Sequence, residues 1–148
     1  MPRFKTADDV LDFAIARERE SYQLYVDLAP IAKRSEVRRL IARLATDELQ
    51  HSAHLHAIKA GKVAFALDEQ VGRLDIEENL EERAPNPGMT YEDLLVFAMK
   101  KEKAAFRLYT NLASIATNES VREALTSLAT QEAEHKLRLE LEYDWATF

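Results

Sequence analysis

The chain has 148 residues, and 20 Lys and Arg against 26 Asp and Glu give it a formal net charge of −6. This acidic balance argues against a nucleic-acid partner, and the absence of cysteine excludes disulfides, Cys-ligated zinc and iron–sulfur clusters within these residues. We expect a cytoplasmic protein with no membrane partner, because no apolar run approaches the ~18 residues of a bilayer span and the N-terminus lacks a signal-peptide pattern.

The sequence repeats itself at a spacing of 84 residues. Positions 6–58 align without a gap on positions 90–142, and 20 of the 53 pairs are identical. The two segments therefore share an ancestry, and each is expected to form the same unit. That unit is a helical hairpin, which predicts one domain made of a hairpin at 6–61, a crossover at 62–89 and a hairpin at 90–145.

In the first repeat, two apolar patterns with alternating steps of three and four residues predict two helices. Thr6 is the expected N-cap of the first helix and Ser35 that of the second, and Gly61 is the expected stop. Pro30 is expected to end or kink the first helix near Ala29, because a proline inside a helix removes a hydrogen bond.

Residues 62–89 are too many for a tight turn, and they suit the long crossover of a four-helix bundle. Five apolar residues are expected to lie along the bundle: Leu67, Val71, Leu74, Ile76 and Leu80. The second repeat starts after a Pro-Asn-Pro-Gly break at 85–88, with Thr90 as the expected N-cap. The predicted fold is all-α: a four-helix bundle made of two repeated hairpins joined by the crossover.

Six polar residues interrupt the apolar pattern at core-facing positions. In repeat-equivalent pairs they are Glu18 and Glu102, Glu48 and Glu132, and His51 and His135. Buried carboxylates are costly without a partner, and no Lys or Arg shares these positions. Two divalent metal ions would neutralise the four carboxylates, and the imidazoles would complete the coordination. The alternative is a set of solvent-facing residues or buried ion pairs kept by a recent duplication.

These six residues resemble the ligand set of the ferritin-like di-iron carboxylate proteins. The segment Ala-Ile-Ala-Arg-Glu18, with Tyr25 seven residues later, is most similar to the rubrerythrin branch. The resemblance covers nearly the whole chain apart from the crossover and the last few residues. Two features depart from rubrerythrins: the cysteines of a rubredoxin domain are absent, and Ala105 stands where rubrerythrins carry an extra Glu.

The resemblance implies a role for each of the six residues. Glu48 and Glu132 would bridge two irons, Glu18 and Glu102 would each be a terminal ligand, and each histidine would bind one iron. Manganese or zinc would be possible substitutes for iron.

Three further side chains are candidates to support this site. The hydroxyls of Tyr25 and Tyr109 could hydrogen-bond a bridging carboxylate, the alternative being tyrosines that simply pack in the core. Asp47 could orient a histidine of the other hairpin, the alternative being an exposed helix acid. The two other histidines have no repeat mates and are expected at the surface.

The predicted function is that of a rubrerythrin-like di-iron oxidoreductase, which reduces hydrogen peroxide or O2 with electrons from an external donor such as rubredoxin. The alternatives are a ferroxidase, iron-storage or iron-delivery protein, a manganese catalase, and a purely structural bundle. A homodimer is expected, with the hairpins meeting either within one chain or by exchange between two chains.

Overall fold

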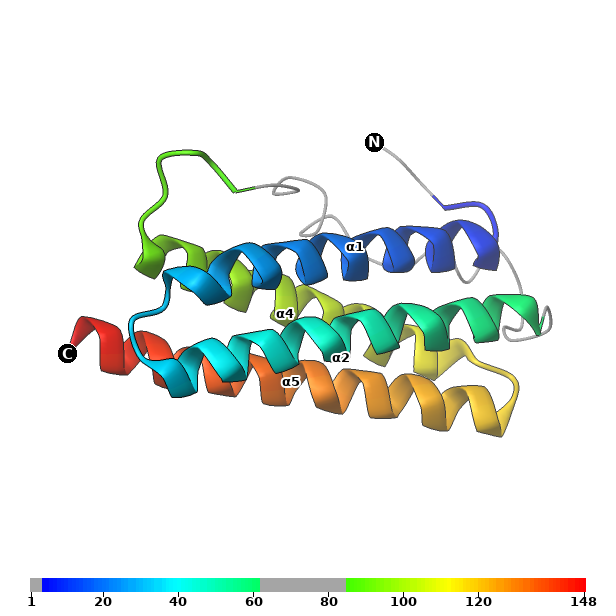
Figure 1. The fold of residues 1–148 in the computed structure, drawn as a ribbon. Helices are drawn as coiled ribbons and strands as arrows, with labels where there is room; N and C mark the ends of the chain where they lie inside the picture. Colours follow the sequence, from blue (N-terminus) through cyan, green and yellow to red (C-terminus); the bar gives the residue numbers. More distant parts are fainter. Residues whose placement is uncertain (1–3, 62–84) are drawn as a thin grey trace.

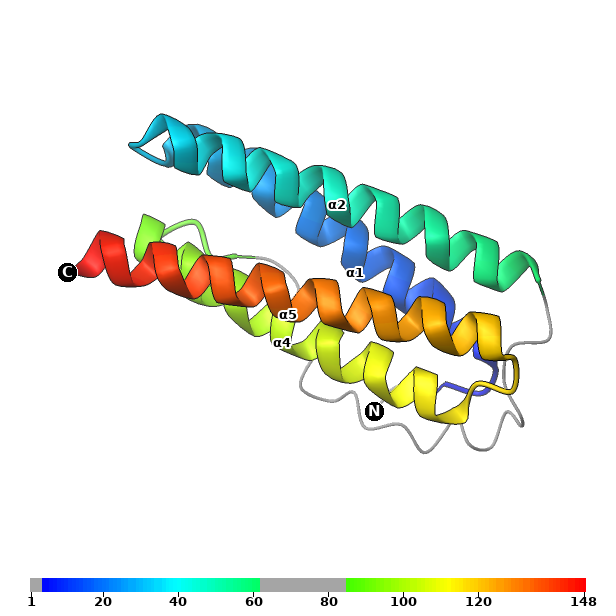
Figure 2. The same cartoon turned by 90° about the horizontal axis from the view of Figure 1, so that it is seen from below.

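The computed structural model describes residues 4–61 and 85–148, and over these residues the chain is helical without a strand (Figure 1). The long helices are α1 (Ala7–Leu28), α2 (Ser35–Ala60), α4 (Tyr91–Ile115) and α5 (Glu119–Thr147). A short 3-10 turn, η1 (Ala29–Ile31), follows α1. Helix α1 pairs with α2, and α4 pairs with α5. Figure 2 shows the two hairpins as two layers, with α1 beside α4 and α2 beside α5. The predicted all-α four-helix bundle is confirmed.

The predicted helix starts are confirmed at both threonines. Thr6 and Thr90 each accept a hydrogen bond from a backbone N–H three residues later, at Asp9 and Asp93, over 3.1 Å. The two aspartates accept in return from the backbone of their threonines, so each helix begins with a capping box. The same residue types, 84 positions apart, thus build the same helix start.

The expectations for the first hairpin turn are partly confirmed. Helix α1 ends at Leu28, and Pro30 lies within η1, as its missing N–H requires. Helix α2 ends at Ala60 with Gly61 as its C-cap. The N-cap prediction for Ser35 is wrong, because Ser35 is the first helical residue and the preceding Arg34 makes no side-chain cap.

Equivalent arginines close both hairpin turns. Arg38 Nη1 donates to the carbonyl oxygen of Ala32 over 2.9 Å, and Arg122 Nη2 donates to that of Ala116 over 2.6 Å. Both the donors and the acceptors are 84 residues apart. The repeat therefore holds in the structure down to the hydrogen bonds that satisfy helix-end carbonyls.

The apolar core consists of two clusters along the bundle. The first includes Leu11, Ile15, Leu55, Leu108, Leu112, Leu125 and Leu128. The second includes Leu24, Leu28, Ile41, Leu44, Leu95, Phe97 and Leu139. On every helix, the polar residues predicted at core-facing positions lie between residues of the first cluster and residues of the second. Apolar packing therefore holds each helix on both sides of them. The apolar residues expected along the bundle at 67–80 lie outside the described residues.

Among the described residues, no helix combines the length and the apolar composition that a bilayer crossing needs.

A buried acid joins the two hairpins near the end of α5. Glu142 is 8% exposed, and its carboxylate accepts hydrogen bonds from Arg34 Nη2 at 3.0 Å and Tyr91 Oη at 2.6 Å. The Arg34 guanidinium in turn lies over the Trp145 ring, 4.5 Å from its centroid. Because Arg34 belongs to the first hairpin and Glu142 to the second, this cluster fixes how the hairpins dock.

We expect Tyr91→Phe to lower the free energy of unfolding by about 1–2 kcal/mol, because it removes the hydrogen bond from the Tyr91 hydroxyl to the Glu142 carboxylate. Urea unfolding at constant m-value measures the loss. Tyr22→Phe is the matched control, because the Tyr22 hydroxyl makes no hydrogen bond among the described residues, and we expect a change close to zero. Equal stability of the two variants would show that the Glu142 cluster does not fix the docking.

Candidate metal centre

The six polar residues predicted from the sequence lie together in the interior of the bundle, and each helix supplies at least one of them. These six residues are between 0% and 4% exposed. The four carboxylates and two imidazoles therefore form a buried polar layer, as the repeat pattern predicted. The alternative of solvent-facing residues is excluded for all six.

The polar layer divides into two overlapping groups of possible metal-binding residues. Atoms of each group lie within 4.8 Å of one another: Glu18, Glu48, His51 and Glu132 in the first group, and Glu48, Glu102, Glu132 and His135 in the second. Glu48 and Glu132 belong to both groups, and the other members belong to one. This arrangement matches two adjacent ion positions that share two carboxylates.

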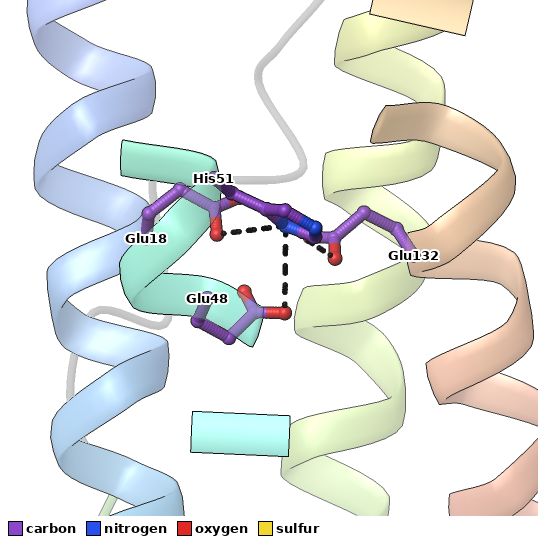
Figure 3. A group of neighbouring side chains, drawn as sticks. All are labelled: Glu18, Glu48, His51 and Glu132. Atoms are coloured by element: carbon purple, nitrogen blue, oxygen red, sulfur yellow. Dashed lines mark ion pairs between the residues drawn. The ribbon is translucent and has the colours of Figure 1, made fainter. Parts of the chain in front are cut away.

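Both histidines direct the same ring nitrogen toward the carboxylates. Figure 3 shows His51 Nδ1 facing Glu132 at 3.2 Å, Glu18 at 3.4 Å and Glu48 at 3.8 Å. The Nδ1 atom of His135 lies 2.8 Å from Glu48 Oε1. The two rings are stacked with their centroids 5.8 Å apart. Each imidazole thus offers one nitrogen to one side of the shared carboxylates.

The other ring nitrogen of each histidine is held by the opposite hairpin. His135 Nε2 donates to Asp47 Oδ2 over 3.0 Å, and His51 Nε2 donates to Gln131 Oε1 over 2.9 Å. The Gln131 amide is oriented by its second contact, from Nε2 to Ser127 Oγ at 3.2 Å. A proton on Nε2 leaves the Nδ1 lone pair for a metal ion. The expectation for Asp47 is confirmed, whereas the sequence reasoning did not foresee the role of Gln131, although its repeat position was a signal.

The two buried tyrosines differ in their contacts. Tyr109 Oη donates to Glu18 Oε1 over 2.5 Å. The expected partner was one of the shared carboxylates, Glu48 or Glu132, so the partner differs from the prediction. Tyr25 is also fully buried, and its hydroxyl has no hydrogen-bond partner in the described part of the chain. Burial, and then the charge of Glu102, raises the pKa of Tyr25 well above its usual value. Both phenols therefore stay protonated.

Protons balance much of the charge of this layer when no metal ion is bound. Burial, and then the charge of Glu132, raises the pKa of Glu102 to about 8. Burial opposes the charge of His135, but its contacts with Glu102 and Glu132 outweigh burial and raise its pKa to about 10. Burial also raises the pKa of Glu48 well above its usual value. A metal ion that binds these groups must displace such protons.

The unpaired atoms of the layer fit a pair of cations. Within the described residues, the buried atoms that make no hydrogen bond include Oε2 of Glu18, Oε2 of Glu48, both carboxylate oxygens of Glu102 and Glu132, and Nδ1 of His51. Some of them lie at ion-pair distance from a histidine ring, but the four carboxylates together have only two imidazoles to face. Buried polar atoms are rarely left unpaired, and buried carboxylates least of all. Oxygen donors with one imidazole for each position suit divalent iron or manganese, so these residues fit two such ions.

A small cavity between α1 and α4 reaches the layer. Its lining includes Glu18, Ser21, Ala105 and Tyr109. The centre of a water-sized molecule has about 10 Å³ of room in it, which is enough for one such molecule. The small side chains of Ser21 and Ala105 keep this space open beside Glu18.

The comparison with protein families agrees with this geometry. The model of the rubrerythrin family matches residues 93–144, which span most of α4 and α5 and contain Glu102, Glu132 and His135. The resemblance to the rubrerythrin di-iron domain is thus confirmed over the second hairpin. No curated protein and no solved structure matches the chain.

Proposed function

On the basis of a rubrerythrin-type second hairpin and the buried layer of Glu and His, we propose that this chain is a non-haem di-iron oxidoreductase that reduces hydrogen peroxide or O2. The observation that carries the proposal is the pair of overlapping groups that share Glu48 and Glu132. Two iron ions held there would each supply one electron, and these two electrons, with two protons from solvent, would convert H2O2 into two waters.

The protein residues would hold the ions and control what reaches them. Glu48 and Glu132 would contact both ions, while Glu18 and Glu102 would each contact one. The hydrogen bond from Tyr109 fixes the orientation of Glu18. The cavity beside Glu18 brings a space the size of one water molecule to the layer, and the surrounding apolar clusters exclude bulk water. Iron is the proposed metal, with manganese or zinc as substitutes.

The proposed electron donor is a separate protein such as rubredoxin, because the sequence contains no cysteine to bind an electron-transfer iron. A homodimer is also part of the proposal. The two hairpins of one chain already bring all six residues together, so an exchange of hairpins between chains is not needed to complete the layer. Light scattering on the purified protein tests the dimer.

Stoichiometric oxidation tests the reaction. We expect the protein loaded with two Fe(II) under anaerobic conditions to consume one H2O2 and to lose both Fe(II), measured with a ferrous chelator after quenching. Glu48→Ala should leave peroxide consumption at the rate of free Fe(II). The matched control Glu134→Gln changes an exposed acid of α5 and should behave as the wild type. Wild-type protein that holds iron but does not accelerate the reaction would contradict the proposal.

A di-manganese catalase is the second candidate, because the oxygen-rich donor set suits Mn(II) as well as Fe(II). Such an enzyme would disproportionate H2O2 without an electron donor. A ferroxidase that stores or delivers iron would use the same layer, but it would release oxidised iron after each reaction. Metal content after purification, the requirement for a donor and the retention of iron after turnover separate the three functions.

A further inference from the structure

We propose that the two metal positions are inequivalent, and that the position beside His135 and Glu102 binds a divalent ion more tightly than the position beside His51 and Glu18. We name them the His135 position and the His51 position. This inference rests on the proposed metal centre and goes beyond it, because it predicts the order in which the two positions fill.

The first difference between the positions is the group that accepts the Nε2 proton of each histidine. Asp47 and Gln131 are repeat mates, 84 residues apart, and each accepts the Nε2 proton of a histidine from the other hairpin over about the same distance, 3.0 and 2.9 Å. The geometry is matched but the charge is not. An anionic acceptor makes the opposite ring nitrogen a stronger donor to a metal ion than a neutral amide does. The His135 position therefore has the imidazole that is held by an anion, which favours metal binding there.

The second difference lies in the carboxylates that belong to one position only. Glu18 accepts a short hydrogen bond from Tyr109, 2.5 Å long, which draws negative charge away from the metal. Glu102 instead has its own histidine as neighbour, with Oε2 lying 2.9 Å from His135 Nδ1, and within the described residues it accepts no hydrogen bond from the Tyr25 hydroxyl. No phenol therefore draws charge away from Glu102 at the His135 position. The two differences arise from separate residues and favour the same position.

Solvent limits the size of the effect. The Asp47 side chain is 42% exposed, so water and salt screen its charge. Partners that orient a ligand histidine change metal affinity by about 10- to 100-fold, and for an exposed carboxylate the lower end of that range applies. We therefore expect a preference of about tenfold for the His135 position.

Crystals loaded with limiting Co²⁺ test the preference for each position separately. Protein with one equivalent of Co²⁺ is crystallised, and anomalous scattering at the cobalt edge gives the occupancy of each position. Asp47→Gln makes both acceptors neutral, and Gln131→Asp makes both anionic. The double variant Asp47→Gln/Gln131→Asp exchanges them. None of these substitutions changes a proposed metal ligand.

In the wild type we expect about threefold higher occupancy at the His135 position, because one equivalent of Co²⁺ shared between two positions whose affinities differ about tenfold fills them in a ratio of about the square root of ten. Each single variant should reduce that ratio, and the double variant should shift the preference toward the His51 position. Equal occupancy in the wild type, or a preference unchanged in the double variant, would overturn the inference while leaving the metal centre intact. Absence of cobalt from both positions would instead contradict the proposed function itself.

Discussion

Replacement of Glu48 by glutamine is expected to reduce metal binding from two ions per chain to fewer than one. Glu48 belongs to both groups of metal-binding residues, so its loss removes an anionic ligand from both positions at once. A neutral amide neither balances the charge of a divalent ion nor bridges two ions as a carboxylate does. Metal content after equilibrium dialysis against Mn²⁺ or anaerobic Fe²⁺ measures the loss.

The same variant should fold at least as well as the metal-free wild type. Burial, followed by the charges of Glu102 and Glu132, raises the pKa of Glu48 well above its usual value, so the metal-free protein favours the protonated form, which an amide mimics. We therefore expect an equal or higher urea midpoint. Glu134→Gln, at an exposed position of α5, should retain both ions. A Glu48→Gln protein that still binds two ions would refute the shared role of Glu48.

The second large effect is stabilisation by metal. A ligand that binds only the folded state at about 100 times its Kd adds about 2.7 kcal/mol, so two filled positions add about 5.4 kcal/mol. For a chain of this size that corresponds to a rise in Tm of roughly 10–20 °C. Thermal unfolding followed by circular dichroism, with Mn²⁺ added and then removed by a chelator, measures this shift.

The stabilisation must depend on the six residues if the layer is the binding site. Glu48→Gln should show a much smaller shift in Tm at the same Mn²⁺ concentration, while Glu134→Gln should keep the full shift. A wild-type Tm that does not respond to metal would mean that the layer is a structural polar cluster. A shift of equal size in Glu48→Gln would mean that metal stabilises the fold at another place.

The repeat is the reason that the sequence predicted so much of the site. A single Glu-x-x-His pattern carries little information, but two copies at equivalent core-facing positions predicted that Glu48, His51, Glu132 and His135 would meet. Helix periodicity and the threonine caps were also sufficient to predict the four helices and the starts of α1 and α4, because both depend on local chemistry. The N-cap prediction at Ser35 failed by one residue, since the turn after η1 places Arg34 before the helix.

Helix periodicity could not predict which side chains of the two hairpins contact one another. The repeat predicts the same environment for both tyrosines. In the described part of the chain, however, Tyr109 donates a hydrogen bond to Glu18, whereas the Tyr25 hydroxyl has no hydrogen-bond partner. Helix faces show which residues point inward, but the docking of one hairpin on the other decides which side chains touch. The pairing of His51 with Gln131 depends on that docking in the same way.

The central claim is a pair of metal ions between Glu48 and Glu132, and anomalous diffraction at the iron edge tests it most directly. Crystals of protein loaded with excess Fe²⁺ under anaerobic conditions should show two peaks about 3.5–4 Å apart, one beside each histidine, with both carboxylates contacting both peaks. A single peak, or iron bound only outside this layer, would contradict a di-iron centre in this protein.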